Sequence, residues 1–288
     1  MFSMQIPFLD LDQVYNSGQV FRWIKFRDGK YAIPYGDSCV KVEQVHNVQG
    51  DRFLFSCDEK EFFEKWYEYF DIGSDYMSMN YDIRLMDEDF RAKAVRAKGI
   101  RILQQDLFEV IITFMLATAT TMSNVKRMLG EIASKCGNMH KQSMREVGVV
   151  KWYEFPTYDM ILDKQKRLSD NFGLKRKENI LSLCKDIDAG WIDIYDMYNM
   201  SYREAREFLM NIEGIGPKVA DCICLYGLHM MESFPIDTHI KQIIMRDFGC
   251  DSFEGFNDWY LTDLQECRGL VQQYMFYNEV HPPVNFER

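Results

Sequence analysis

The first part of the chain carries short β-like runs, whereas the rest repeats its apolar residues at helical spacing. Four runs favour strands, at 20–26, 30–36, 39–45 and 52–57, and Asp-Gly, Gly-Asp and Asn-rich turns separate them. From Glu59 onward, beginning with EKEFFEKWYEYF, apolar residues recur three and four positions apart, which is the period of a half-buried helix. The pattern therefore predicts an α+β chain, with a small antiparallel β-domain at 1–72 followed by a larger all-α region at 73–288.

The helical region divides into segments joined by short polar or glycine-containing turns. Helices are expected near 86–98, 105–118, 121–136, 159–170, 175–188, 202–211, 217–229 and 237–247, with a C-terminal helix at about 258–278. One turn is distinctive, because Gly214 and Gly216 flank a single residue and glycine adopts angles that other residues avoid. Pro217 then suits the first turn of a helix. The spacing predicts a helix-hairpin-helix at about 203–229.

The same segment carries the candidate chemistry. The N–H groups of the hairpin, around Gly214, Gly216 and Val219, are left free at a helix start and can bind a phosphate. Lys218 stands at that positive helix end, where a charged amine is disfavoured and a nucleophilic one is favoured. Asp237 opens the next helix and is a good N-cap. Taken singly, each would be a solvated lysine or a simple cap; together, in this order and spacing, they indicate a catalytic site.

Composition adds limits. The chain has 288 residues, 47% of them hydrophobic and 15% aromatic, which is typical of a globular protein and not of a disordered one. Its longest apolar stretch, about 13 residues from Val110 to Met122, is too short to span a bilayer. The eight cysteines are scattered, and we expect free thiols in a reducing compartment.

The net charge of −10 is unevenly distributed. Residues 58–89 contain eleven acidic and three basic side chains, a local charge of −8 that leaves −2 for the remaining chain. Basic residues gather at 91–101 and 164–177; either cluster could also be a solvated helix face. Because phosphate contacts are local, an acidic total does not exclude DNA binding. We expect the acidic block to face away from nucleic acid.

The stretch 211–247 resembles the helix-hairpin-helix and aspartate module of base-excision DNA glycosylases. KVADCICL followed by FPIDTH is similar to the 8-oxoguanine DNA glycosylase branch of that superfamily. The resemblance implies that the Lys218 amine attacks the sugar C1′ and that Asp237 is its essential acidic partner. It also implies that His239 lines the site and that Cys222 packs against the flipped base.

Two further stretches resemble the same branch. SGQVFRW, from Ser17 to Trp23, is similar to its N-terminal signature, which implies that the Gly18 carbonyl accepts the N7 hydrogen that distinguishes 8-oxoguanine from guanine. GLVQQYMFY implies that Gln272 hydrogen-bonds the base edge and that Phe276 stacks on its face. By themselves these residues would be a turn glycine, a surface glutamine and a core phenylalanine.

Other positions depart from the family pattern. Ala119 stands where the branch commonly has an asparagine that fills the gap left by the flipped base. Asn124 replaces an arginine that reads the opposite cytosine in animal members. The aromatic-arginine wedge is represented by Leu174 and Lys175, and leucine can still act as an apolar wedge. The resemblance therefore implies DNA contacts at these four positions but leaves the preferred opposite base open.

The expected protein is a bifunctional glycosylase and lyase that binds double-stranded DNA containing 8-oxoguanine, as a monomer without membrane attachment. Its expected place is the cytoplasm, at the nucleoid, or a nucleus. No cofactor is required, and an iron–sulfur cluster is not expected because only Cys250 and Cys267 follow the catalytic segment. The hairpin carbonyls of Met210, Ile212 and Ile215 are candidate ligands for a monovalent structural cation. Two alternatives remain: a helix-hairpin-helix glycosylase for another damaged base, and a non-catalytic helix-hairpin-helix DNA-binding protein.

Overall fold

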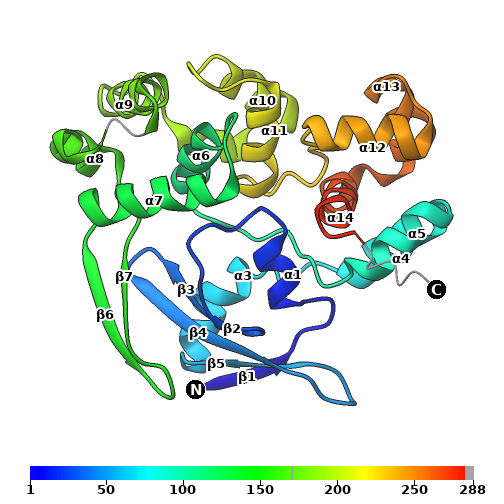
Figure 1. The fold of residues 1–288 in the computed structure, drawn as a ribbon, viewed down its shortest axis with the longest axis horizontal. Coiled ribbons are helices and arrows are strands. Elements are labelled where there is room, and N and C mark those ends of the chain that lie inside the picture. The colour runs from blue at the N-terminus through cyan, green and yellow to red at the C-terminus, as the bar shows by residue number, and fades with distance from the viewer. Residues whose placement is uncertain (170–171, 283–288) are drawn as a thin grey trace.

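A computed structural model describes residues 1–169 and 172–282, and its N-terminal part is a five-stranded antiparallel sheet (Figure 1). The strands are β1 (Phe2–Gln5), β2 (Ile24–Arg27), β3 (Lys30–Tyr35), β4 (Ser38–Val45) and β5 (Arg52–Phe55), in the order β1-β5-β4-β3-β2. Consecutive hairpins join β2 to β5, as the turn residues predict. The edge strand β1, which pairs with β5, and the helix α1 (Leu11–Asn16) were not predicted.

One face of this sheet is covered by a short helical segment. Helix α2 (Glu59–Glu61), the π-helical turn η1 (Phe62–Trp66) and α3 (Tyr67–Tyr69) follow one another along the chain. Alternate strand residues such as Phe53 and Phe55 are fully buried together with Phe62 and Trp66 in one cluster. Burying side chains of this size stabilises the fold by about 2–3 kcal/mol each, so this N-terminal unit has an aromatic core of its own.

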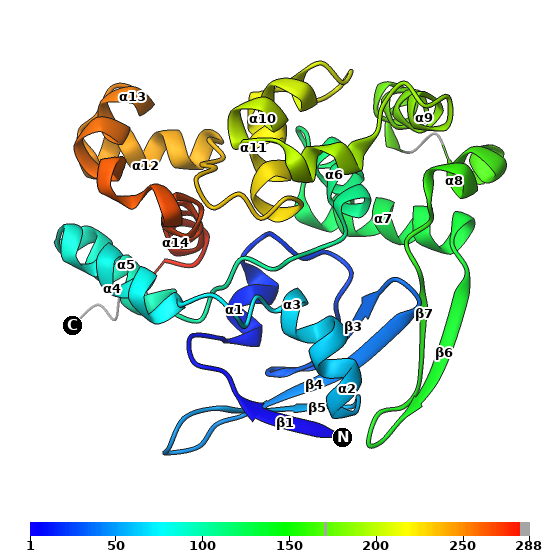
Figure 2. The same ribbon diagram turned by 180° about the vertical axis from the view of Figure 1, so that it is seen from behind.

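The helices form two further clusters above the sheet (Figures 1 and 2). One contains α6 (Leu107–Leu116), α7 (Met122–Cys136), α8 (Tyr158–Lys164) with η2 (Gln165–Arg167), α9 (Leu174–Asp188), η4 (Ile194–Asn199), α10 (Tyr202–Met210) and α11 (Pro217–Tyr226). The other contains α4 (Tyr76–Met86), α5 (Glu88–Arg96), α12 (Thr238–Phe248), α13 (Phe253–Phe256), η5 (Asn257–Leu261), η6 (Thr262–Cys267) and α14 (Arg268–Val280). The predicted α+β class is confirmed, with the helix-hairpin-helix at α10 and α11; the boundary at residue 72 stays a prediction.

One element of the helical region is a two-stranded hairpin, so this region is not entirely helical as predicted. Strand β6 (Met139–Met144) pairs with β7 (Gly148–Tyr153) and extends along one side of the sheet (Figures 1 and 2). The buried Lys30 amine of β3 lies 2.8 Å from the Glu146 carboxylate in the hairpin turn. The hairpin is therefore held in place by contacts with a segment more than a hundred residues away.

The C-terminal helix is shorter than predicted. The expected continuous helix at about 258–278 begins only at Arg268, because 257–267 is wound in π-helical and 3₁₀ turns. Leu264, with φ −112° and ψ 26°, lies outside the helical region of backbone angles and marks the break. Helix α4 was also not predicted. Within the described residues, no helix has the length and apolar character needed to cross a membrane.

Candidate active site

The hairpin between α10 and α11 has the geometry that its glycines predict. Gly214 has φ +92°, and a β-carbon there would lie 2.2 Å from the Nδ2 atom of Asn179, so a side chain is excluded by both strain and space. Gly216 precedes Pro217 at the start of α11, and no side chain caps that helix. Open space surrounds the Cα of Gly216. Among the described residues, no capping side chain would therefore compete with a phosphate for the first N–H groups of α11.

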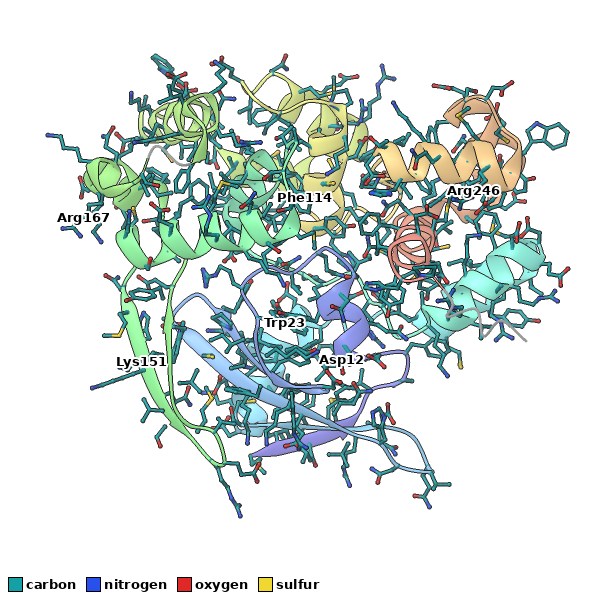
Figure 3. All side chains as sticks on the ribbon, in the orientation of Figure 1. Asp12, Trp23, Phe114, Lys151, Arg167 and Arg246 are labelled. Atoms are coloured by element: carbon teal, nitrogen blue, oxygen red, sulfur yellow. The ribbon has the colours of Figure 1, made fainter. Side chains whose placement is uncertain are left out.

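Lys218 is the second residue of α11 and is half-buried. Its Nζ atom lies 5.4 Å from the centroid of the Phe114 ring of α6. The Phe114 ring stacks in turn on Tyr226, with 5.3 Å between centroids, where α6 and α11 meet (Figure 3). Burial raises the pKa of the neighbouring Cys222 thiol to about 11, although Lys218 acts in the opposite direction. The amine thus stands between an aromatic pair and a protonated thiol.

Asp237 lies across from this amine, at the start of α12. Its Oδ1 atom accepts the N–H of Ile240 at 2.8 Å, which is the N-cap bond expected from the sequence. The cap fixes one carboxylate oxygen on the helix axis. Because α11 and α12 belong to different hydrophobic clusters, Lys218 and Asp237 lie on opposite sides of the junction between them.

A cavity of about 200 Å³ connects the two residues. Every residue predicted for catalysis or for the base pocket lines it: Gly18, Lys218, Cys222, Asp237, His239, Gln272 and Phe276. The His239 ring meets the Phe276 ring edge-on at 6.1 Å. The structure therefore assembles in one place residues that are separated by more than 250 positions in the chain.

The Gly18 side of the cavity leaves no room for a side chain. Gly18 has φ +86°, and a β-carbon built there would lie 3.2 Å from Cε1 of Phe276. Opposite, the buried Gln272 receives a hydrogen bond on Oε1 from Nε2 of Gln273 at 3.3 Å. The same Nε2 donates to the hydroxyl of Tyr226 at 2.6 Å. This chain of bonds orients the Gln272 amide toward the cavity.

The comparisons with known proteins agree with this geometry. Residues 2–111 match the family model of the 8-oxoguanine DNA glycosylase N-terminal domain. A crystal structure of an 8-oxoguanine glycosylase/lyase from Clostridium acetobutylicum, in complex with double-stranded DNA containing cytosine opposite to 8-oxoG, superposes with a TM-score of 0.83 at 26% identity. That superposition covers 96% of this chain and 93% of that one. The chain is therefore similar to the 8-oxoguanine DNA glycosylase family, whose N-terminal domain model matches residues 2–111.

Curated relatives of this chain include two N-glycosylase/DNA lyases. The Saccharomyces cerevisiae protein is 33% identical over 163 residues, which are 52% of this chain and 42% of that protein. The Arabidopsis thaliana protein is 23% identical over 82% of this chain and 65% of its own length. The chain thus spans less than two thirds of the length of these two relatives. A probable N-glycosylase/DNA lyase from Methanothermobacter thermautotrophicus is 26% identical, and the match covers 95% of both chains.

The four further positions expected at the DNA lie outside the cavity. Leu174 is 67% exposed in the first turn of α9, and Lys175 beside it forms an ion pair with Glu213 of the hairpin. Ala119 has φ +47° in the loop between α6 and α7. Asn124 donates from Nδ2 to Thr120 Oγ1 at 3.3 Å. None of these four residues lines the cavity, so their contact with DNA stays a prediction.

Sequence reasoning missed three residues that shape the site. The sequence pattern does not single out Phe114 or Tyr226, yet their rings stack on each other and the Phe114 ring lies 5.4 Å from the Lys218 Nζ atom. The resemblance names Gln272 but not its neighbour Gln273, which is 2% exposed and whose Oε1 atom has no hydrogen-bond partner among the described residues. Two adjacent glutamines between apolar residues of α14 were the available signal, because buried amides are normally paired.

The candidate cation ligands are hairpin carbonyls. The carbonyl of Ile212 accepts the N–H of Ile215 at 3.1 Å, so one of the three candidates also serves the turn itself. A carbonyl oxygen has a second lone pair, and ligation by backbone oxygens suits a hard cation. The cation at Met210, Ile212 and Ile215 remains a prediction. The structure has each of the eight cysteines as a free thiol.

Proposed function

We propose that this protein removes 8-oxoguanine from duplex DNA and then cleaves the strand at the resulting abasic site. The observation that carries the proposal is the single cavity in which Lys218 and Asp237 face Gly18, Gln272 and Phe276. Similarity to N-glycosylase/DNA lyases and to an 8-oxoguanine glycosylase/lyase supports the same activity. The neighbour bound to double-stranded DNA supports a DNA partner.

The chemical step uses the Lys218 amine as a nucleophile. Its nitrogen forms a bond to C1′ of the damaged nucleotide while the bond from C1′ to the base breaks, and the departing base takes the bonding electrons. Positive charge develops on the sugar as the bond breaks. The Asp237 carboxylate, held by its bond to the Ile240 N–H, stabilises that charge electrostatically.

Strand cleavage follows from the covalent intermediate. Loss of a proton from nitrogen and ring opening give a Schiff base between Lys218 and C1′. Removal of a C2′ proton then expels the 3′ phosphate by β-elimination, and water releases the lysine from the cleaved product. Every step uses groups of the nucleotide, water and this side chain, so no cofactor is needed.

Recognition of the base is assigned to three other residues of the cavity, Gly18, Gln272 and Phe276. A base inside the duplex must leave the stack to enter the cavity, at a cost of a few kcal/mol. The Gly18 carbonyl would accept the N7 hydrogen that 8-oxoguanine carries and guanine lacks. Gln272 would bind the Watson–Crick edge, and Phe276 would stack on the face. The first N–H groups of α11 would hold a phosphate of the same strand.

We propose that the enzyme works as a monomer wherever the genome lies, at a nucleoid or in a nucleus. The deciding experiment is cleavage of four labelled duplexes that carry 8-oxoguanine opposite each of the four bases, with undamaged guanine as the control. We expect strand scission on at least one damaged duplex and borohydride trapping of the protein on the DNA. Inactivity on all four, together with activity on an alkylated purine or an oxidised pyrimidine, would reassign the substrate.

A matched lysine tests the nucleophile. Lys218→Gln should lose trapping, whereas Lys241→Gln, an exposed lysine one turn after Asp237, should keep it. Trapping that survives in the Lys218 variant would exclude this residue as the attacking amine.

A further inference from the structure

Two adjoining cavities, distinct from the one at Lys218, open at the other end of α6. One has a volume of about 550 Å³ and the other about 450 Å³, and Tyr35 and Lys65 line both. The first is bounded by Asp106, Phe108 and Glu109 at the start of α6, whereas Phe114 and Ala117 at its end border the active site. A ten-residue helix is about 15 Å long. We refer to the joined cavities as the aromatic groove.

Aromatic rings form much of the wall of the aromatic groove. Tyr195 lines the larger cavity and Tyr198 the smaller one. Each of these side chains is 56% exposed, and their rings stack with 13° between planes. Phe155 and Tyr158 add further rings in the larger cavity. Solvent-exposed aromatic residues gathered in a depression are typical of protein interaction sites.

The charge of the aromatic groove is acidic. Its lining includes five carboxylates, from Glu64, Glu68, Asp106, Glu109 and Asp193. The basic residues in the lining are both engaged, since Lys65 hydrogen-bonds Ser38 and His229 lies 3.2 Å from Asp71. Two of the carboxylates, Glu64 and Glu68, come from the acidic block at 58–89. The groove thus gives part of that block a defined location.

Several of these carboxylates lack a counter-ion. Within the described ranges, Glu68, Asp106 and Asp193 have no cationic side chain at ion-pair distance. Glu109 is paired with Arg22 at 3.3 Å, yet burial still raises the pKa of its carboxyl. The pKa of Asp106 is also raised, chiefly by burial. A bound cation would supply the counter-ion that Glu68, Asp106 and Asp193 lack among the described residues.

We propose that the aromatic groove binds an arginine-containing basic segment of a partner protein. Guanidinium groups stack on aromatic faces and pair with carboxylates in the same site, which a lysine does less well. The two cavities, of about 550 and 450 Å³, are each larger than one side chain requires. Nucleic acids and anionic membrane surfaces carry the same charge sign as the groove, so they would be repelled. This interaction is separate from the proposed repair activity.

The test measures, by fluorescence anisotropy, how a fluorescein-labelled peptide of five arginine–serine repeats binds to the full chain. The triple variant Glu68→Gln, Asp106→Asn and Asp193→Asn removes three charges, and asparagine preserves the two helix caps that these aspartates provide. We expect about tenfold weaker binding or more for this variant, and weaker binding at higher salt.

A charge-matched control separates the groove from the overall acidity of the chain. Asp82→Asn, Glu88→Gln and Asp251→Asn remove the same three charges from exposed positions elsewhere, and should change binding less than about twofold. The double variant Tyr195→Ala and Tyr198→Ala provides an independent test if the charge variant folds poorly. Both rings are exposed, so we expect this variant to fold. The tyrosine double variant should also weaken peptide binding about tenfold, because two cation–π contacts are lost.

Five results would overturn the proposal. Four come from binding measurements: no saturable binding to the wild-type chain, equal weakening in the charge-matched control, equal binding of a peptide in which citrulline replaces arginine, and full binding by the tyrosine double variant. The fifth comes from competition. Competition by spermine at equal charge concentration would instead identify a site for free polyamines and would also reject a protein partner. The proposal is supported if the groove variants bind the peptide more weakly while the charge-matched control binds it nearly as well as the wild-type chain.

Discussion

Replacing Gly18 by alanine perturbs the base pocket through one methyl group. The backbone there has φ +86°, and an L-residue in this region costs about 1–2 kcal/mol. The new β-carbon would also lie 3.2 Å from Cε1 of Phe276, closer than the usual 3.5–4.0 Å contact of two carbons. The Phe276 ring must therefore move by a few tenths of an ångström, toward the space in which the base would stack.

The backbone strain and the displaced Phe276 ring should change two different measured quantities. The strain should lower the free energy of unfolding by about 1–2 kcal/mol, which urea denaturation reports. The displaced ring should lower kcat/KM on an 8-oxoguanine duplex by about 10- to 100-fold, since small misplacements of a bound reactant are costly in rate. The assay is single-turnover base release, with kcat/KM taken from steady-state cleavage of the same duplex.

Gly148→Ala is the matched control. Gly148 has φ +76° in the β6–β7 turn, and a β-carbon at this position would meet nothing within 4 Å, so the variant should show the same loss of stability with unchanged activity. Wild-type kcat/KM in Gly18→Ala, or an equal loss of kcat/KM in both variants, would refute the assignment of Gly18 to the base pocket.

Three further predictions concern charged residues. Lys218→Gln should lower base release at least about a thousandfold, measured by single-turnover kinetics, without changing the thermal midpoint. Asp237→Asn should keep the capping bond to Ile240, so that base release falls about 10²- to 10³-fold while DNA affinity, measured by anisotropy, hardly changes; equal losses in both would indicate a structural role. At Asp71, burial acts to raise the pKa, but His229 together with the hydrogen bonds from Tyr76 and Ser74 outweighs burial, and the net pKa is lowered below 3.8. The stabilising contribution of this carboxylate is therefore present above pH 3.8 and lost as pH falls through the folded-state pKa. Asp71→Asn should then make the unfolding free energy less dependent on pH between about pH 5 and pH 2, and an unchanged acid limb in urea titrations would contradict this.

Local sequence signals were sufficient for the catalytic segment. Gly214, Pro217 and Asp237 each determine backbone geometry through their own chemistry, so the hairpin and both helix starts could be predicted without tertiary information. The β6–β7 hairpin could not, because the contact that fixes its turn joins Glu146 to Lys30 across 116 positions. Its alternating buried residues Val150 and Trp152 were a weak period-two signal.

The cavity itself depends on long-range packing. Gly18 and Phe276 are neighbours only because α14 returns to the N-terminal part of the chain, and no local pattern relates them. Family resemblance supplied both residues. It did not supply Gln273, whose hydrogen bond to Tyr226 connects α14 to α11, because that contact depends on how two distant helices approach each other.

In and beside the loop between α6 and α7 lie Ala119 and Asn124, two positions at which the family resemblance leaves the preferred opposite base open. Ala119 offers no side-chain hydrogen bond, and its carbonyl already accepts from Nη2 of Arg176 at 3.4 Å. The amide of Asn124, in the first turn of α7, likewise donates a hydrogen bond to Thr120 in the loop. Polar groups that are used inside the protein must lose those bonds before they can read a base, which lowers the discrimination that they can provide. The comparison of the four opposite bases therefore measures this loop, whereas borohydride trapping measures Lys218, and the two results can be interpreted independently.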